Sequence, residues 1–220
     1  VMSGQVTSLY TLSIPNYQLV VNMAGELVET SVDNGDGTFT YNVPVREGYT
    51  WSDGSPITAN DWEFTFDTVK NLSLGGNFLS SYPYSCEDEE GTAKNCVVSV
   101  VASDDYTVSI TFNYDPGLST WQYGTAQGIA FSKAYWEQYA TDKETLYAHD
   151  ATNAPVASAF VYDKLEQGAF YTWKYDANTM WYGGTTTIYD GGGTSVDWDN
   201  GKAPAFSADF GNTTGDSFSY

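Results

Sequence analysis

Strict alternation of apolar and polar residues, in residues 38–45 and 106–112, constrains the fold of this chain most strongly. A period of two is typical of a β-strand that has one buried face. Both segments adjoin runs of Asp, Asn, Ser and Gly, which favour tight turns. The sequence therefore predicts two antiparallel hairpins, in which these strands pair with residues 27–32 and 97–102. A third hairpin is expected over residues 159–175.

A helix is predicted after the turn-rich connection at residues 51–57, which follows the first hairpin. Thr58 is followed three residues later by Asp61, which is the spacing of a capping box, and apolar residues then recur with a period of 3.6. A second helix is expected over residues 133–140, with Ser132 as its cap, and a further turn or two over residues 142–148. The predicted fold class is α+β, with β-rich antiparallel hairpins and two or three short helices.

The charge balance excludes several classes of function. The 220 residues include 8 Lys and Arg against 28 Asp and Glu, which gives a formal net charge of −20. Such a chain repels nucleic acid and anionic lipid, so neither is expected as a partner. The single arginine, Arg46, and the single histidine, His149, exclude most nucleophilic triads, His-ligated metals and bidentate phosphate clamps. We therefore expect no catalytic residue, no cofactor and no metal site.

Two cysteines and two sequons indicate an extracellular or cell-surface protein. Cys86 and Cys96 lack the spacing of a zinc or redox motif, so we predict a disulfide that closes a polar loop, with two free thiols as the alternative. The acidic run at residues 87–90 suits a solvated loop tip or a weak Ca²⁺ site. N-glycosylation sequons begin at Asn71 and Asn212. The export signal is expected to have been removed or to lie outside this chain.

Two long runs of sequence resemble one protein family. The first runs through Arg46-Glu47-Gly48-Tyr49-Thr50-Trp51-Ser52-Asp53-Gly54-Ser55-Pro56-Ile57-Thr58-Ala59-Asn60-Asp61-Trp62. The second covers residues 155–184 and includes Phe160-Val161-Tyr162-Asp163 and Trp181-Tyr182-Gly183-Gly184. Both resemble the signature of the family 5 extracellular solute-binding proteins, the receptors of oligopeptide, dipeptide and nickel ABC importers. The likeness extends in the correct order over roughly residues 20–184, with Ser158-Ala159 where the family usually has Gly-Pro.

The resemblance implies a subdomain of the first lobe of a bilobal, periplasmic-binding-protein-like (class II) fold. Residues 1–184 would form this subdomain, and the Gly-, Thr- and Asp-rich residues 185–220 would lead toward a second lobe that the chain lacks. Family members are much longer, so we expect either a piece of a longer receptor or a lone domain with another use. The implied function is capture of an oligopeptide or an oligosaccharide, without catalysis, for delivery to an ABC permease.

Aromatic side chains are the candidates for ligand binding, because rings contribute contact area at little cost in conformational entropy. We single out Trp121 and Tyr123, on a segment expected to be a loop, together with Trp51 and Trp173. The alternative for each ring is a place in the hydrophobic core or in support of a turn. The resemblance assigns no ligand residue, because the groups that clamp peptide termini lie largely in the second lobe.

Two other functions are compatible with the sequence. Strand addition through residues 185–189 would build a homopolymer such as a filament or a surface layer, although the same segment suits a loose connection. A glycosidase needs two carboxylates about 5–10 Å apart. Some pair among 28 acidic residues meets that requirement in almost any fold, so this signal carries little information.

Overall fold

The computed structural model of the chain describes residues 4–13, 17–158, 160–166, 168–176, 185–189 and 195–199. The chain divides into two units, of which the first ends at Ala157 and the second begins at Ser158. Within the described residues, the main sheet and the helices belong to the first unit, and two hairpins belong to the second.

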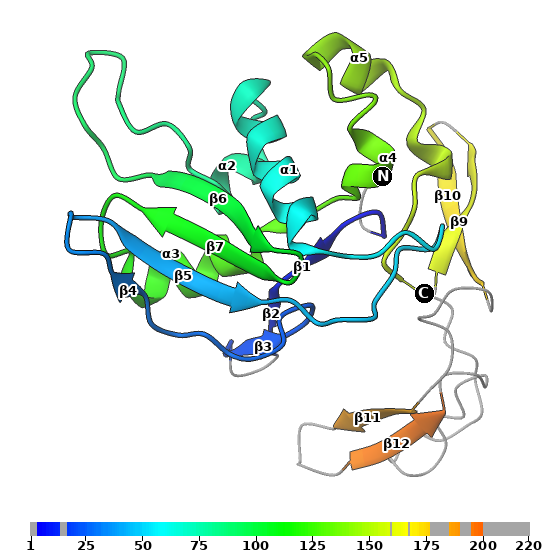
Figure 1. The fold of residues 1–220 in the computed structure, drawn as a ribbon. Coiled ribbons are helices and arrows are strands. Elements are labelled where there is room, and N and C mark those ends of the chain that lie inside the picture. The colour runs from blue at the N-terminus through cyan, green and yellow to red at the C-terminus, as the bar shows by residue number, and fades with distance from the viewer. Residues whose placement is uncertain are drawn as a thin grey trace. The chain divides into compact units, whose positions relative to one another are not determined.

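Four antiparallel strands form the main sheet in the spatial order β4-β5-β7-β6 (Figure 1). They are Val32–Asp33 (β4), Phe39–Pro44 (β5), Val97–Asp104 (β6) and Thr107–Phe112 (β7). Strands β5 and β7 pair along their whole length, so their alternating patterns coincide. The predicted strands are thereby confirmed, and one face of the sheet buries Tyr41, Val43, Val108, Ile110 and Phe112.

The first hairpin is shorter than the sequence predicts, because residues 27–31 lie outside any strand. Side chains take the place of a partner strand there. The Tyr10 hydroxyl donates to the Glu26 carbonyl at 2.9 Å and accepts from the Val28 N–H at 3.1 Å. The Trp121 indole N–H donates to the Val28 carbonyl at 2.8 Å. A backbone whose polar groups are already satisfied by side chains gains little from joining a sheet.

Helix α1 (Ala59–Asn71) packs on the buried face of the sheet, beside β6 (Figure 1). As predicted, Thr58 is its N-cap, and the Asp61 carboxylate accepts a hydrogen bond from the Thr58 N–H at 3.0 Å. The Glu63 carboxylate accepts from the Ala102 N–H of β6 at 2.8 Å, so α1 also engages the backbone of the edge strand. The helix buries Trp62, Phe66 and Val69.

Short elements complete one side of the first unit. They are α2 (Asn77–Ser81), α3 (Gly117–Tyr123), the 3₁₀ turn η1 (Thr125–Gln127), and the strand pairs β1 (Thr7–Ser8) with β8 (Ile129–Ala130) and β2 (Tyr10–Leu12) with β3 (Leu19–Val21). The prediction of a loop after the second hairpin is therefore wrong, because helix α3 forms in that segment. Packing beside η1 is tight, because a Cβ atom on Gly128 would lie 2.6 Å from the Tyr82 ring.

The remaining helices of this unit surround the single histidine. Helix α4 (Lys133–Trp136) has Ser132 as its N-cap as predicted but ends earlier than residue 140, and α5 (Lys143–Ala148) and η2 (Ala151–Asn153) follow. The His149 ring stacks on Tyr139 at a centroid distance of 3.5 Å, and its Nε2 lies 2.9 Å from the Tyr135 hydroxyl. The histidine is thus held among aromatic rings.

The second unit contains two antiparallel hairpins. Strands β9 (Phe160–Glu166) and β10 (Phe170–Tyr175) form the predicted third hairpin, and β11 (Thr185–Tyr189) pairs with β12 (Ser195–Asp199). The observed elements confirm the predicted α+β class with antiparallel strands. The boundary expected after residue 184, which rests on the family resemblance, stays a prediction.

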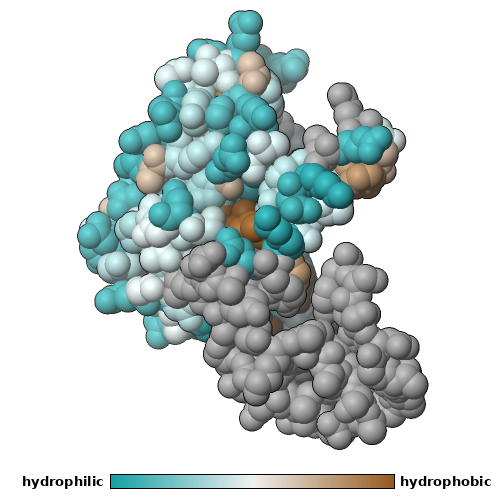
Figure 2. Space-filling view, turned by 90° about the vertical axis from the view of Figure 1, so that its right-hand side faces the viewer, coloured by the Kyte–Doolittle hydropathy of each residue, from teal (hydrophilic) through white to brown (hydrophobic). Residues whose placement is uncertain are grey.

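One face of the molecule is mainly polar. On the face drawn in Figure 2, hydrophilic residues surround small, scattered hydrophobic spots. Among the residues that the structure describes, no helix combines the length and the apolar character needed to cross a membrane.

Candidate ligand-binding surface

Helix α3 begins where an Asp-Pro-Gly run ends strand β7. Pro116 is its N-cap, and the Asp115 carboxylate accepts a hydrogen bond from the Gly117 N–H at 3.3 Å. Proline suits a helix start, where its missing N–H leaves no gap in the hydrogen-bond ladder. The helix reads Gly-Leu-Ser-Thr-Trp-Gln-Tyr and carries no charged residue. In a chain of net charge −20, such a helix is suited to contact neutral groups.

Trp121 lies in the core and anchors α3 to the sheet. The ring has no exposed surface, stacks on Tyr41 of β5 with centroids 3.8 Å apart, and meets Tyr10 edge-on at 6.1 Å. Burial raises the pKa of the Tyr10 hydroxyl to about 12, which keeps it a neutral hydrogen-bond donor. The core alternative therefore holds for Trp121.

Trp51 is also buried, and it belongs to a joint between three segments. Its indole N–H donates to the Asp61 carboxylate at 3.3 Å, and the same carboxylate accepts from the Lys133 N–H at the start of α4 at 2.8 Å. Burial raises the pKa of Asp61, and the hydrogen bonds from Lys133, Thr58 and Trp51 oppose that rise. The Trp-to-Asp run that carries the family resemblance thus ties a turn, α1 and α4 together.

Trp173 belongs to the second unit and supports its first hairpin. The ring is partly buried and packs edge-on against Tyr162 of β9, with centroids 6.1 Å apart. A register shift between Thr172 and Trp173 marks a bulge at this point of the hairpin. The contact with Tyr162 agrees with the turn-supporting alternative for this ring.

Tyr123 is the candidate on α3 that remains at the surface, with 53% of its side chain exposed. Leu118 of the same helix is 58% exposed. The neighbouring Gln122 is buried and donates from Nε2 to the Tyr17 carbonyl at 2.7 Å, which ties α3 to the turn before β3. Tyr17 is 60% exposed and has a φ of +51°, an uncommon conformation for a bulky residue. Tyr17, Leu118 and Tyr123 are the exposed large side chains on α3 and on the segment that Gln122 ties to it, and this set of residues is called the α3 surface below.

Sequence reasoning missed Gln122 and Tyr17. The two residues are 105 positions apart, and no periodicity relates them. The one usable signal was the Asp-Pro-Gly run at residues 115–117, which favours a helix start as well as a break.

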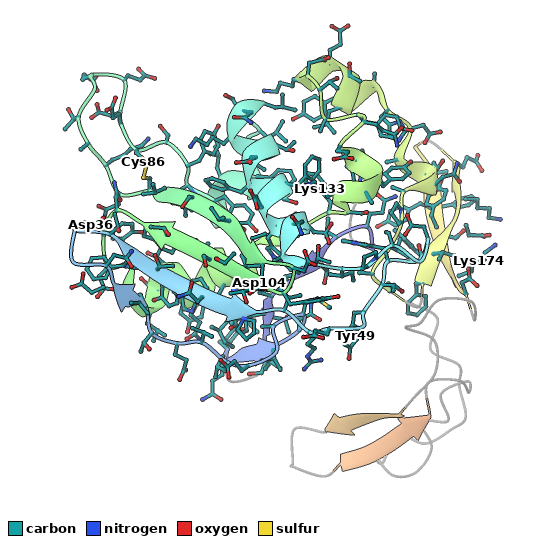
Figure 3. All side chains as sticks on the ribbon, in the orientation of Figure 1. Asp36, Tyr49, Cys86, Asp104, Lys133 and Lys174 are labelled. Carbon is teal, nitrogen blue, oxygen red and sulfur yellow. A yellow bond between two sulfur atoms is a disulfide. The ribbon has the colours of Figure 1, made fainter. Side chains whose placement is uncertain are left out.

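The predicted disulfide is present at the base of a projecting loop (Figure 3). Cys86 and Cys96 have Cα atoms 5.0 Å apart, and Asn113 of the neighbouring strand end accepts a hydrogen bond from the Cys96 N–H at 2.9 Å. The acidic residues 87–90 are exposed, and the Asp88 carboxylate accepts two backbone N–H groups of its own loop. Within the described residues, no group of three or more His, Cys, Asp or Glu side chains is placed to hold a metal ion.

The two sequons differ in what the structure shows. Asn71 is the last residue of α1 and is exposed. Asn212 lies outside the described residues.

Comparison with known proteins identifies the family. Residues 22–202 match the bacterial extracellular solute-binding proteins, family 5 Middle. The oligopeptide-binding protein OppA of Bacillus subtilis (strain 168) is 33% identical over 93 residues, which are 39% of this chain and 16% of OppA.

Solved structures share the fold. Peptide-bound OppA of Listeria monocytogenes matches with a TM-score of 0.55 and 18% identity, over 80% of this chain and 34% of that one. A mannohexaose-bound periplasmic oligopeptide-binding protein of Thermotoga maritima matches with a TM-score of 0.54 and 19% identity, over 80% and 28% of the two chains. The chain therefore spans less than a fifth of the curated relative and about a third of these structures, and the expected likeness to part of a bilobal fold is confirmed. Because the family match covers well over half of its residues, the chain belongs to the bacterial extracellular solute-binding proteins, family 5.

Proposed function

We propose that this protein is the extracellular solute-binding component of an ABC importer, and that it binds oligopeptides, or in second place oligosaccharides, without catalysis. The α3 surface carries the proposal. Tyr123 and Leu118 present exposed apolar area on a helix without charge, in a chain that is otherwise strongly acidic. Neutral backbone or sugar groups can pack on such a surface without desolvating a carboxylate.

The names of similar proteins support both ligand classes. The matched OppA of Bacillus subtilis is an oligopeptide-binding protein, and OppA of Listeria monocytogenes is bound to peptide. The Thermotoga maritima protein is bound to mannohexaose. Transfer of the ligand to an ABC permease is the role that the family implies for this chain.

The anchoring of α3 suits it to binding rather than to bond chemistry. The buried Trp121 fixes the helix to the sheet, and Gln122 fixes the Tyr17 turn to the helix. Backbone segments that are held in place before the ligand arrives lose little conformational entropy on binding. The ligand would then shift the population of the whole receptor toward a closed state, with no covalent step.

Thermal unfolding of the purified protein tests the proposal, with a panel of tetra- to hexapeptides and mannohexaose as probes. A ligand at 100 times its Kd should add about 2.7 kcal/mol to the free energy of unfolding. Tyr123→Ala should weaken binding about tenfold, which corresponds to about 1.4 kcal/mol. Tyr147→Ala is the matched control, because this tyrosine is 67% exposed on α5, away from the α3 surface. Absence of any thermal shift and of any calorimetric binding heat with all probes would overturn the proposal.

Assembly and hydrolysis stay secondary predictions. Residues 185–189 pair with β12, and strand addition would require this hairpin to accept a further strand. A monomer at every concentration in light scattering would contradict assembly. Release of sugar from an oligosaccharide panel would support hydrolysis, and an unchanged panel would contradict it.

A further inference from the structure

The C-terminal end of α1 carries a group that solute binding does not use. Asn71 ends the helix, and Leu72 and Ser73 complete an Asn-X-Ser sequon. Asn71 and Ser73 are both exposed. In Figure 1 this end of α1 rises beyond the edge of the sheet and points away from α3.

We propose that Asn71 is an N-glycosylation site. Within the described residues, no hydrogen bond or ion pair engages its side-chain amide. Ser73 has a φ of +49°, which turns the chain out of the helix, and Leu74 returns it to the core with only 2% of its surface exposed. The sequon is thus held on an ordered turn between a helix end and a buried anchor.

The two glycines that follow this turn have free space beside them. A Cβ atom built on Gly75 or Gly76, which follow the turn directly, would meet no atom within 4 Å. The Lys143 ammonium donates to the Ser73 carbonyl at 3.2 Å, and this contact leaves the Ser73 hydroxyl and the Asn71 amide untouched. An enzyme can therefore approach the acceptor amide, and the folded chain can carry the product.

The chemistry is a glycosyl transfer from a lipid-linked oligosaccharyl phosphate, supplied with its transferase in the export compartment. The Nδ2 atom of Asn71 forms a bond to the anomeric carbon of the first sugar. The bond between that carbon and the phosphate oxygen breaks, and the lipid phosphate leaves with the electron pair. A base of the transferase takes one proton from Nδ2, and the Ser73 hydroxyl is the recognition group of the sequon.

Mass spectrometry of peptides from the protein purified from its native source tests the proposal. The peptide that contains Asn71 should carry a mass increment that equals a whole number of sugar residues and disappears on chemical deglycosylation. Asn71→Gln and Ser73→Ala should both abolish the increment, the second with the acceptor amide still in place. Asn95→Gln is the control, because Asn95 is exposed but belongs to no sequon, and it should leave the increment unchanged.

The folding of each variant is checked by circular dichroism. Gln is a better helix former than Asn, so Asn71→Gln should not disturb α1. Retention of the increment in Ser73→Ala would overturn the sequon mechanism. Recovery of only unmodified Asn71 from the native source would overturn the proposal itself, and it would leave solute binding unaffected.

Discussion

Replacing Asp61 by alanine tests the conclusion that one carboxylate joins three segments of the first unit. This carboxylate accepts hydrogen bonds from the N–H groups of Thr58 at 3.0 Å and Lys133 at 2.8 Å, and from the Trp51 indole at 3.3 Å. Only 3% of the Asp61 surface is exposed. Alanine would leave three N–H donors without this acceptor, in a place that water reaches poorly.

The magnitude follows from those three contacts. A buried donor without a partner costs about 1–3 kcal/mol, and loss of a helix-cap interaction costs about 1 kcal/mol. For the Trp51 contact, which at 3.3 Å is the longest, we take the low end of this energy range. We expect Asp61→Ala to lower the free energy of unfolding by about 3–5 kcal/mol, which is a large part of the 5–15 kcal/mol typical of a domain, as an order of magnitude.

Asp61→Asn adds a test of the charge. Burial raises the pKa of Asp61 above its ordinary value of 3.8 in the folded state. In the pH window between the two values, the folded protein holds a proton that the unfolded chain has released. The stability that this group contributes therefore falls as the pH rises through that window, and Asp61→Asn should lack this slope.

Urea unfolding followed by far-UV circular dichroism measures both effects, and it avoids a fluorescence signal from Trp51 itself. Asp67→Ala is the control, since Asp67 is an exposed carboxylate on the same helix and should change stability by less than about 0.5 kcal/mol. If the Asp61 and Asp67 variants lose the same amount, the carboxylate does not join the segments and the reasoning fails.

Three further changes probe other parts of the first unit. Removing the disulfide with Cys86→Ser should cost about 3 kcal/mol of loop-closure stabilisation, for a sequence separation of 10, and an unchanged urea midpoint would contradict this. Glu63→Ala removes the acceptor of the Ala102 N–H on an edge strand, so dimers should appear in light scattering as concentration rises, and a strict monomer would show that the edge is protected otherwise. Gly128→Ala places a methyl group 2.6 Å from the Tyr82 ring and should lower the melting temperature by several degrees, for a cost of about 1–3 kcal/mol; an unaltered melting curve would refute the tight packing.

Local patterns predicted those elements whose stability depends on neighbours in sequence. The alternation around Tyr41 and Val108 identified β5 and β7, because burial of one strand face repeats every second residue. The spacing of Thr58 and Asp61 located the start of α1, because a capping box depends only on two residues three positions apart. The pairing of β5 with β7 joins segments that are distant in sequence, and no local pattern encodes it.

The ligand candidates could not be separated from the core by sequence. A large ring is favoured in a hydrophobic core and in a binding surface by the same property, its apolar area. Trp121 and Tyr123 lie two positions apart on one short helix, yet the first is fully buried and the second is half exposed. Their difference depends on where Tyr41 and Tyr10 lie in space.

The satisfaction of the Val28 backbone by two side chains has a kinetic consequence. Its N–H is bound by Tyr10 and its carbonyl by Trp121, a residue 93 positions away. Such contacts form only after a long loop has closed, which places them late in folding. Hydrogen exchange at the Val28 amide would therefore measure how often its hydrogen bond to the Tyr10 hydroxyl breaks, independently of any opening of the main sheet. The exchange rate of the Val28 amide proton would thus report how often the aromatic packing around Tyr10 and Trp121 opens.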